Sequence, residues 1–74
     1  MTIYSVQSGD WEGPEIWSSN TVPDLSVDDV VILENHVVDI DSGASLILGP
    51  GRWINVDSDG GLNVYGTLQL QSSE

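Results

Sequence analysis

Apolar residues at even-numbered positions return in pairs with a step of eight residues, and this pattern restricts the fold of the chain more than any other feature. Alternation within each pair is the two-residue period of a strand with one buried face. The constant step predicts short strands separated by tight turns, in a repeat architecture. The sixth pair comes six residues after the fifth, still in phase, and the pairs are Val30/Ile32, Val38/Ile40, Leu46/Leu48, Ile54/Val56, Leu62/Val64 and Leu68/Leu70.

Two all-β architectures fit this step. The first is a short single-chain β-solenoid with two strands in each 16-residue rung, which would stack Val30 on Leu46 and Leu46 on Leu62. The second is an antiparallel β-meander or sandwich, in which tight turns join neighbouring strands. The stacks of like residues at 16-residue spacing favour the solenoid, and the meander is kept as the alternative.

A chain of 74 residues forms one domain at most. Three parts follow from the pattern: an N-terminal strand and a tryptophan-rich cap over residues 1–28, the repeat array over 29–70, and a tail over 71–74. Trp11 and Trp17 are large enough to close one end of the stack, whereas nothing visible in the sequence closes the other end. A core of this size is marginal, and the chain has no cysteine for disulfides. We therefore expect a homo-oligomer, another structural partner, a metal, or a longer parent chain.

The charge balance is strongly acidic. The chain has twelve Asp and Glu residues and one basic residue, Arg52, for a net charge of −11. Nucleic acids and anionic membrane surfaces would be repelled, so we predict neither as a partner. The opening residues lack the basic and apolar regions of a signal peptide, and no apolar run is long enough to cross a bilayer. We expect a protein of a virion or of an extracellular surface, with no signal peptide in this chain.

Four aspartates form a candidate calcium group: Asp39, Asp41, Asp57 and Asp59. In the 16-residue register, Asp41 and Asp57 would lie one rung apart, at about 4.8 Å. Two carboxylates at that spacing repel each other unless a cation or a proton intervenes. Calcium takes six to eight oxygen ligands and is the one candidate here, whereas no cofactor is otherwise expected. The alternative is that these acids are solvated turn residues.

Large side chains outside the inner pairs are candidates for a ligand or subunit surface. Three tryptophans would suit the apolar faces of a glycan, unless two of them are cap core. Apolar residues at odd positions would form a subunit interface, trimeric for example, unless the N-terminal segment folds back over them. The seven candidates are Trp11, Trp17, Trp53, Val31, Val37, Ile47 and Tyr65.

A longer pattern resembles a known family. It comprises Gly9-Asp10-Trp11, a second tryptophan, Val22-Pro23, a strand from Asp29 to Ile32 and another from Val38 to Asp41, with Gly61-Leu62-Asn63-Val64 further on. This pattern resembles the start of the extracellular domain named for its eight glycines and of β-helix adhesin-like and phage fibre-like modules. The resemblance implies a β-rich scaffold that binds a ligand or surface, and it carries over no site residues.

These observations predict a non-enzymatic structural or interaction module. The single histidine, His36, lies in a turn and belongs to no nucleophile motif, and a lone histidine is too few for a zinc site. Among twelve acids, chance carboxylate pairs do not indicate a glycosidase. We expect a homo-oligomeric virion component such as part of a tail fibre or spike. The alternative is a carbohydrate- or calcium-dependent surface-binding module of a larger secreted adhesin.

Overall fold

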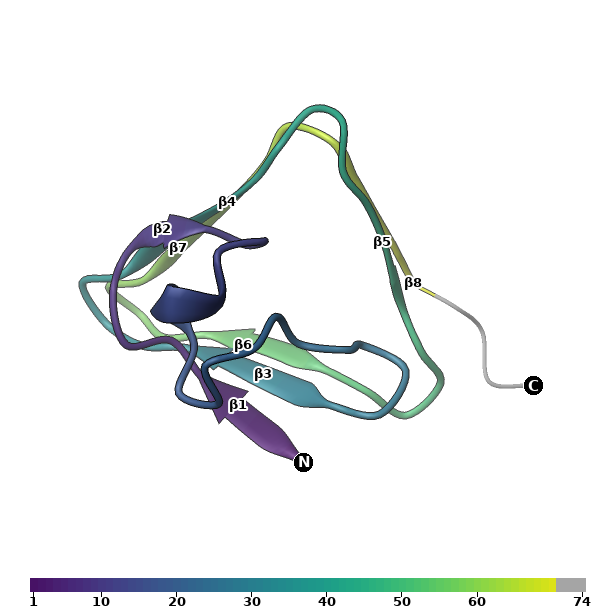
Figure 1. The fold of residues 1–74 in the computed structure, drawn as a ribbon, viewed down its shortest axis with the longest axis horizontal. Helices are drawn as coiled ribbons and strands as arrows, with labels where there is room; N and C mark the ends of the chain where they lie inside the picture. The colour runs from purple at the N-terminus through teal and green to yellow at the C-terminus, as the bar shows by residue number, and fades with distance from the viewer. Residues whose placement is uncertain (71–74) are drawn as a thin grey trace.

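The computed structural model describes residues 1–70 and is built almost entirely of short strands (Figure 1). Over these residues, no helix is long and apolar enough to cross a membrane. The predicted tail, 71–74, lies outside the described residues. The elements are β1 (Thr2–Tyr4), β2 (Gly9–Asp10), the 3-10 helix η1 (Pro14–Ile16), β3 (Asp29–Ile32), β4 (Val37–Ile40), β5 (Ser45–Leu48), β6 (Ile54–Val56), β7 (Gly61–Val64) and β8 (Thr67–Leu70).

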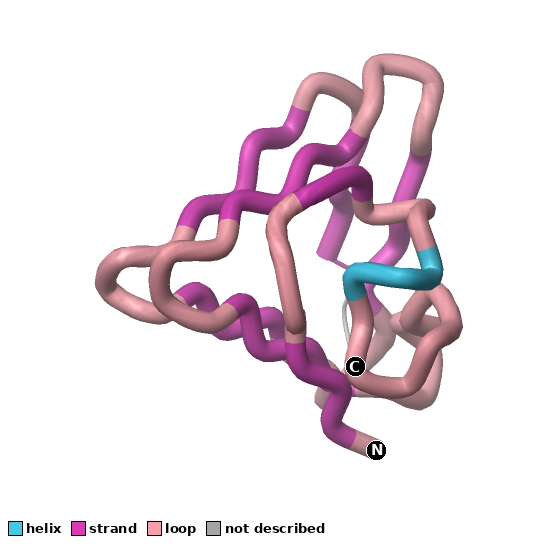
Figure 2. Tube along the Cα trace, turned by 60° about the vertical axis from the view of Figure 1, so that its left-hand side comes forward, coloured by secondary structure: helices cyan, strands magenta, loops and turns pink. Residues whose placement is uncertain are grey.

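Three small parallel sheets form the three sides of a triangle, as Figure 1 shows. Their strand orders are β1-β3-β6, β2-β4-β7 and β5-β8. The chain visits the sides in turn, so that β3, β4 and β5 make one circuit and β6, β7 and β8 make the next. Figure 2 shows the strands of successive circuits lying side by side. The prediction of an all-β chain is confirmed.

The strand register corrects the predicted 16-residue rung. Val30 pairs with Ile54 and Val38 pairs with Leu62, so β3 and β4 lie beside the third strand after them rather than the second. Leu46 pairs with Leu68 in the same way. The eight-residue step therefore separates strands on different sides of the triangle, and three strands make one circuit. The expected stacking of Val30 on Leu46 is wrong. The antiparallel meander is wrong as well, because all the named strand pairs are parallel.

The even-numbered apolar residues point inward, as their alternation predicts. Val30, Ile32, Val38 and Ile40 are each 0% exposed. The first strand reverses the parity, because Ile3 pairs with Val30 and is buried. Its separation from Val30 is an odd number of positions, since the intervening irregular segment obeys no strand period. The inner side of the triangle is thus a continuous apolar core.

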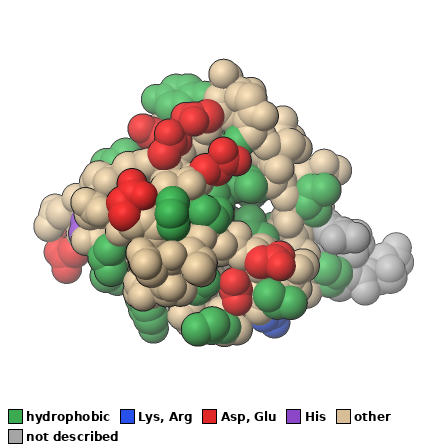
Figure 3. All heavy atoms as spheres, viewed as in Figure 1, with side chains coloured by type: hydrophobic (Ala, Val, Ile, Leu, Met, Phe, Trp, Pro, Cys, Tyr) green, Lys and Arg blue, Asp and Glu red, His purple; other side chains and the backbone are tan. Residues whose placement is uncertain are grey.

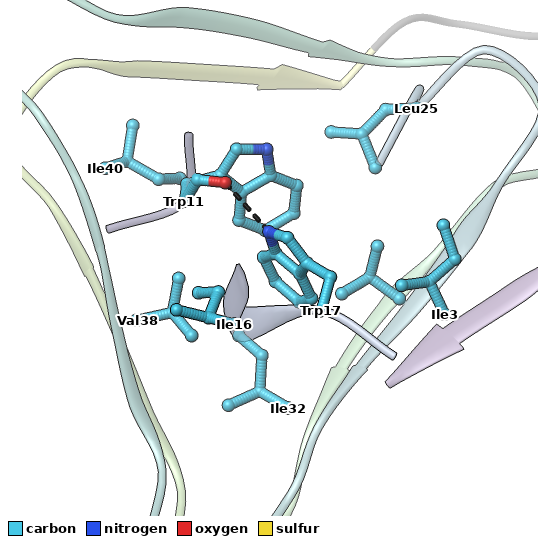
Figure 4. Packing of buried hydrophobic residues seen from close by; sticks show 9 residues of the cluster. Ile3, Trp11, Ile16, Trp17, Leu25, Ile32, Val38 and Ile40 are labelled. Carbon is cyan, nitrogen blue, oxygen red and sulfur yellow. Dashed lines mark hydrogen bonds between the residues drawn. The ribbon is translucent and has the colours of Figure 1, made fainter. Parts of the chain in front are cut away.

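Residues 11–28, which we call the tryptophan segment, cross over one end of the triangle (Figure 1). Trp11 and Trp17 are 1% and 2% exposed and meet edge to face, with ring centroids 4.9 Å apart. Nε1 of Trp17 donates a hydrogen bond to the carbonyl oxygen of Trp11 at 2.8 Å (Figure 4). The two rings belong to one buried cluster with Ile16, Leu25 and the inner residues of β1, β3 and β4, and the inner residues of β5 pack against this cluster.

Candidate functional site

The two ends of the triangle differ in whether chain covers the strand edges. At the first end, the tryptophan segment pairs with the outer edge of β1. The N–H of Ser18 donates to the carbonyl of Tyr4 at 2.8 Å, and the N–H of Val6 donates to the carbonyl of Ile16 at 2.7 Å. Beside β5, the N–H of Gly49 donates to the carbonyl of Leu25 at 2.9 Å. These backbone groups are therefore already satisfied.

At the second end, β6, β7 and β8 are the outermost strands, and within residues 1–70 no further strand pairs with them. The inner side chains of this circuit lose their cover. The exposed fraction rises from 0% at Ile32 to 37% at its partner Val56, and from 0% at Ile40 to 43% at Val64. Leu70 on β8 is 73% exposed. We call the free edges of β6, β7 and β8 the open end.

The strands of the open end carry no charge, although the chain has a net charge of −11 and the corner between β6 and β7 holds Asp57 and Asp59. None of the three strands contains a Lys, Arg, Asp, Glu or Pro residue. Natural sheets usually protect a free edge with charged residues, proline or a bulge. The outward side chains here are Thr67 and the amides Asn55, Asn63 and Gln69, and all four are exposed. Sequence reasoning did not single out these amides, although the uncharged strands of so acidic a chain were a readable signal.

An acidic group lies on the outer side of the β2-β4-β7 sheet. Asp10 of β2 pairs with Asp39 of β4, and Asp39 Oδ1 accepts a hydrogen bond from Nδ2 of Asn63 on β7 at 3.0 Å. A hydrogen bond with the side chain of Asp41 is the main cause that raises the pKa of Asp10 above 3.8. Burial and the charges of Asp41, Asp39 and Glu12 raise this pKa further. Figure 3 shows acidic side chains spread over the end of the molecule that the tryptophan segment covers.

The candidate calcium group is not assembled. Asp57 follows β6, where its N–H donates to the carbonyl of Ile32, so it lies at the corner between the first and second sides. Asp41 follows β4, at the corner between the second and third sides. The predicted contact between Asp41 and Asp57 is wrong because a circuit takes three strands rather than two. Asp59 lies near Asp57 and Asp39 lies within β4, and over residues 1–70 no three His, Cys, Asp or Glu side chains gather as metal ligands do.

The seven candidate ligand and interface residues do not share a surface. Trp11 and Trp17 are buried, which corrects the idea that three tryptophans form one glycan platform. Trp53 is 44% exposed just before β6. The outward apolar residues are distributed over all three sides of the triangle: Val31 on β3, Val37 on β4, Ile47 on β5 and Tyr65 after β7.

Arg52, the one basic residue of the chain, has a structural place. Its Nε lies 3.5 Å from Oδ1 of Asp29, and its guanidinium donates to the carbonyl of Val27 at 3.1 Å. The same Asp29 oxygen accepts the N–H of Trp53 at 3.1 Å. These contacts fix the corner between β5 and β6 against the start of β3. The arginine is therefore engaged in holding a turn.

His36 meets a serine that the sequence analysis did not pair with it. Ser5 Oγ lies 2.7 Å from Nδ1 of His36 and accepts the N–H of Leu33 at 2.9 Å. A nucleophilic serine must reach its substrate, and Ser5 is 0% exposed. The contact therefore ties the chain after β1 to the corner between β3 and β4.

A shallow depression of about 400 Å³ lies between residues 23–26 and residues 45–47. Its one ionisable side chain is Asp24, which accepts hydrogen bonds from the hydroxyl and the N–H of Ser26 at 2.7 and 3.0 Å. These bonds hold the pKa of Asp24 below 3.8. A carboxylate so occupied has the role of a turn residue.

Comparisons with family models, with curated proteins and with solved structures find nothing that matches this chain. The resemblance to the domain named for its eight glycines therefore stays a prediction that rests on its motifs. Of all the surfaces described, the open end departs most from what an isolated domain would need.

Proposed function

We propose that the chain is a short parallel β-solenoid with three strands in each circuit, and that it serves as a non-enzymatic structural or interaction module. The parallel pairing of β3 with β6, β4 with β7 and β5 with β8 supports this fold. The tryptophan segment is its cap, because it fills one end with buried rings and occupies the edge of β1. The open end is its docking surface.

The contrast between the two ends is the observation that carries this proposal. One end has buried tryptophans and a covered β1 edge, whereas the other has free strand edges, exposed apolar side chains and uncharged strands. A free edge presents a row of N–H and C=O groups that readily pair with another strand. Partners recognised by strand addition gain their affinity from such main-chain hydrogen bonds.

The surroundings predicted from the sequence belong to the same proposal. A homo-oligomeric tail fibre or spike component would use such an end to join units, and a larger secreted adhesin would use it to join further coils. The virion role is our first proposal and the adhesin role the alternative. The alternative keeps the predicted carbohydrate- or calcium-dependent binding to a surface, although Trp11 and Trp17 are buried and the candidate aspartates lie apart within residues 1–70.

An added circuit tests whether the open end accepts strands. A duplicate of residues 49–70 inserted after Leu70 supplies three more corners and three more strands, which make one full circuit in the spacing that links β5 to β8. The longer chain is expected to melt at a higher temperature, and the amides of β6, β7 and β8 are expected to exchange more slowly with deuterium. A matched control carries the same inserted segment with its residues in scrambled order.

Equal melting temperatures for the native chain, the extended chain and the scrambled control would refute the proposal. The same conclusion would follow if the added circuit left the amides of β6 to β8 unprotected. Protection by the ordered circuit alone would support it, since only ordered strands continue the ladder.

A further inference from the structure

A molecule that docks on the open end must itself have unpaired strand edges, and a second copy of this chain has them at its own open end. We propose that a second copy docks there tail to tail, so that the open ends of two molecules pair about a two-fold axis. This inference rests on the proposed function, since it names the partner of that same surface. A head-to-tail arrangement would find the first end partly occupied, because residues 16–18 already hydrogen-bond along β1 and Leu25 already bonds to Gly49.

The geometry of a triangle is compatible with such a two-fold axis. Turning one copy over brings its last strands against those of the other in antiparallel orientation, which suits edge-to-edge hydrogen bonding. The axis passes through one side and the opposite corner. One strand therefore pairs with its own copy, and the other two exchange partners. The contact is isologous and closes at two molecules, because each copy has one open end.

The outward side chains of the open end are self-complementary. Asn55, Asn63 and Gln69 each carry both a donor and an acceptor group, so an amide can bond to the amide of an identical chain. A carboxylate would instead repel its own copy. Charge is absent from these three strands and is confined to Asp57 and Asp59 at the corner between β6 and β7, so two molecules of net charge −11 can bring these strands together.

The inner side chains of the last circuit supply the apolar part of the contact. In the single chain they remain partly or largely exposed, whereas those of the preceding circuit are better covered. A second open end placed against them would extend one core through both molecules. The side chains concerned are Ile54, Val56, Leu62, Val64, Leu68 and Leu70.

Sedimentation equilibrium of the full chain, from about 1 μM to about 1 mM, tests the proposal over the range of weak protein dimers. The expected result is a monomer–dimer equilibrium with no larger species. Leu70→Lys is expected to raise the dimer dissociation constant by about tenfold or more, because it puts a charge into the paired ends. Leu70 is 73% exposed, so the variant keeps its fold.

Two controls locate the contact. Val27→Lys, at a side chain 57% exposed on the tryptophan segment, is expected to leave the dissociation constant unchanged. Ile47→Lys, at a side chain 54% exposed on β5, tests the side-to-side interface predicted from the sequence and is likewise expected to change nothing. Gln69→Lys on the outer side of β8 repeats the test should Leu70→Lys alter the circular dichroism spectrum.

Three results would overturn the inference: a monomer at the highest concentration, a trimer or larger species, or weakening by Ile47→Lys without weakening by the two β8 variants. If the chain stays monomeric while the added circuit of residues 49–70 stabilises it, the open end accepts strands but a second copy is not its partner. If the added circuit also fails, the proposed function fails with the inference.

Discussion

Asn63 on β7 donates a hydrogen bond from Nδ2 to Oδ1 of Asp39 on β4, at 3.0 Å. The two residues are far apart in the sequence and pair directly across adjacent parallel strands. Asp39 pairs on its other side with Asp10. It therefore has a carboxylate neighbour on β2 and a hydrogen-bonding amide neighbour on β7. The acidic group therefore reaches β4 and stops before the open end.

Asn63→Asp is expected to destabilise the chain, because it replaces that hydrogen bond with two carboxylates facing each other. Like charges directly opposite in a sheet cost up to about 1 kcal/mol. In a domain of this size, such a loss lowers Tm by about 4–8 °C. The difference from the native chain is expected to shrink at about pH 3, where carboxyl groups are protonated.

Thermal unfolding at low protein concentration checks this prediction. Gln69→Glu is the matched control, since Gln69 pairs with Ile47 and meets no opposing acid. Equal losses in the two variants would show that the facing carboxylates are not the cause.

Asp10→Asn is expected to raise Tm at pH 7. The hydrogen bond with Asp41, followed by burial and the neighbouring charges, raises the pKa of Asp10 in the folded state above 3.8. The protonated carboxyl therefore stabilises the fold fully at pH values below 3.8, and this stabilisation is lost as pH rises through the folded-state pKa. Asparagine imitates the protonated form, so the gain is expected at pH 7 and should vanish at about pH 3.

Asp24→Asn is expected to change Tm in the opposite direction to Asp10→Asn when the two variants are compared over the same range of pH. Hydrogen bonds from Ser26 hold the pKa of Asp24 below 3.8, so its contribution is present above that value and is lost as pH falls through the folded-state pKa. This variant is expected to lower Tm at pH 7 and to match the native chain in strong acid. Parallel pH profiles for the two variants would contradict both assignments.

The two buried tryptophans are expected to differ in what their indole N–H contributes. Nε1 of Trp17 donates to the carbonyl of Trp11, whereas Nε1 of Trp11 is buried and has no partner in the part of the chain that the structure describes. Both substitutions to phenylalanine remove similar volume. Trp17→Phe also removes a buried hydrogen bond, so it should cost about 1–3 kcal/mol more than Trp11→Phe.

Urea unfolding followed by circular dichroism measures this difference without relying on tryptophan fluorescence. A larger loss for Trp11→Phe would mean that its N–H has a partner, such as a buried water.

Ser5→Ala is expected to destabilise the chain by about 1–3 kcal/mol, because the partly buried N–H of Leu33 loses the buried Ser5 hydroxyl as its acceptor. Ser8→Ala is the control, since Ser8 Oγ accepts the N–H of Val37 at 2.8 Å in an exposed position. Water can replace that acceptor, so its loss should stay within about 0.5 kcal/mol. Similar free energies of unfolding for both variants would show that burial of Ser5 is not decisive.

The inner face of the strands was predictable from the sequence, whereas the number of strands in a circuit was not. Alternation identified Val30 and Val38 as core because a strand has a period of two. An eight-residue step fits two or three strands per circuit equally well. The corners held the missing information: residues 33–36 and 57–60 are equally long connections one circuit apart.

The candidate site was harder to predict, because it is defined by what lies beside it in space. The prediction that Asp41 lies beside Asp57 assumed two strands in each circuit. With three strands in each circuit, the two residues lie at different corners of the triangle. The partner of His36 escaped notice because it is Ser5, which is distant in the sequence. The sequence predicts that one end of the stack is uncovered. It does not predict the backbone hydrogen bonds by which residues 16–18 cover the edge of β1 at the other end.

Gly66→Ala is expected to be the most damaging small substitution in the second circuit. Gly66 lies at the corner between β7 and β8, and a Cβ atom there would collide with the carbonyl oxygens of Asp41 and Ala44. The Ala44 carbonyl also accepts the N–H of Thr67 at 3.0 Å, so the corner cannot move without disturbing the pairing of β8 with β5. Forced shifts of this kind cost about 1–3 kcal/mol.

Gly43→Ala is the matched control for that substitution. Gly43 occupies the corresponding corner of the preceding circuit, between β4 and β5, and beyond its chain neighbours no atom lies within 4 Å of the place that an alanine methyl would take. Alanine there is expected to be neutral or stabilising by about 0.4–1 kcal/mol, because it restricts the unfolded chain. Amide exchange should show faster opening of β8 in Gly66→Ala and none in Gly43→Ala. Equal exchange rates on β8 in both variants would mean that the close approach at Gly66 does not hold the second circuit against the first.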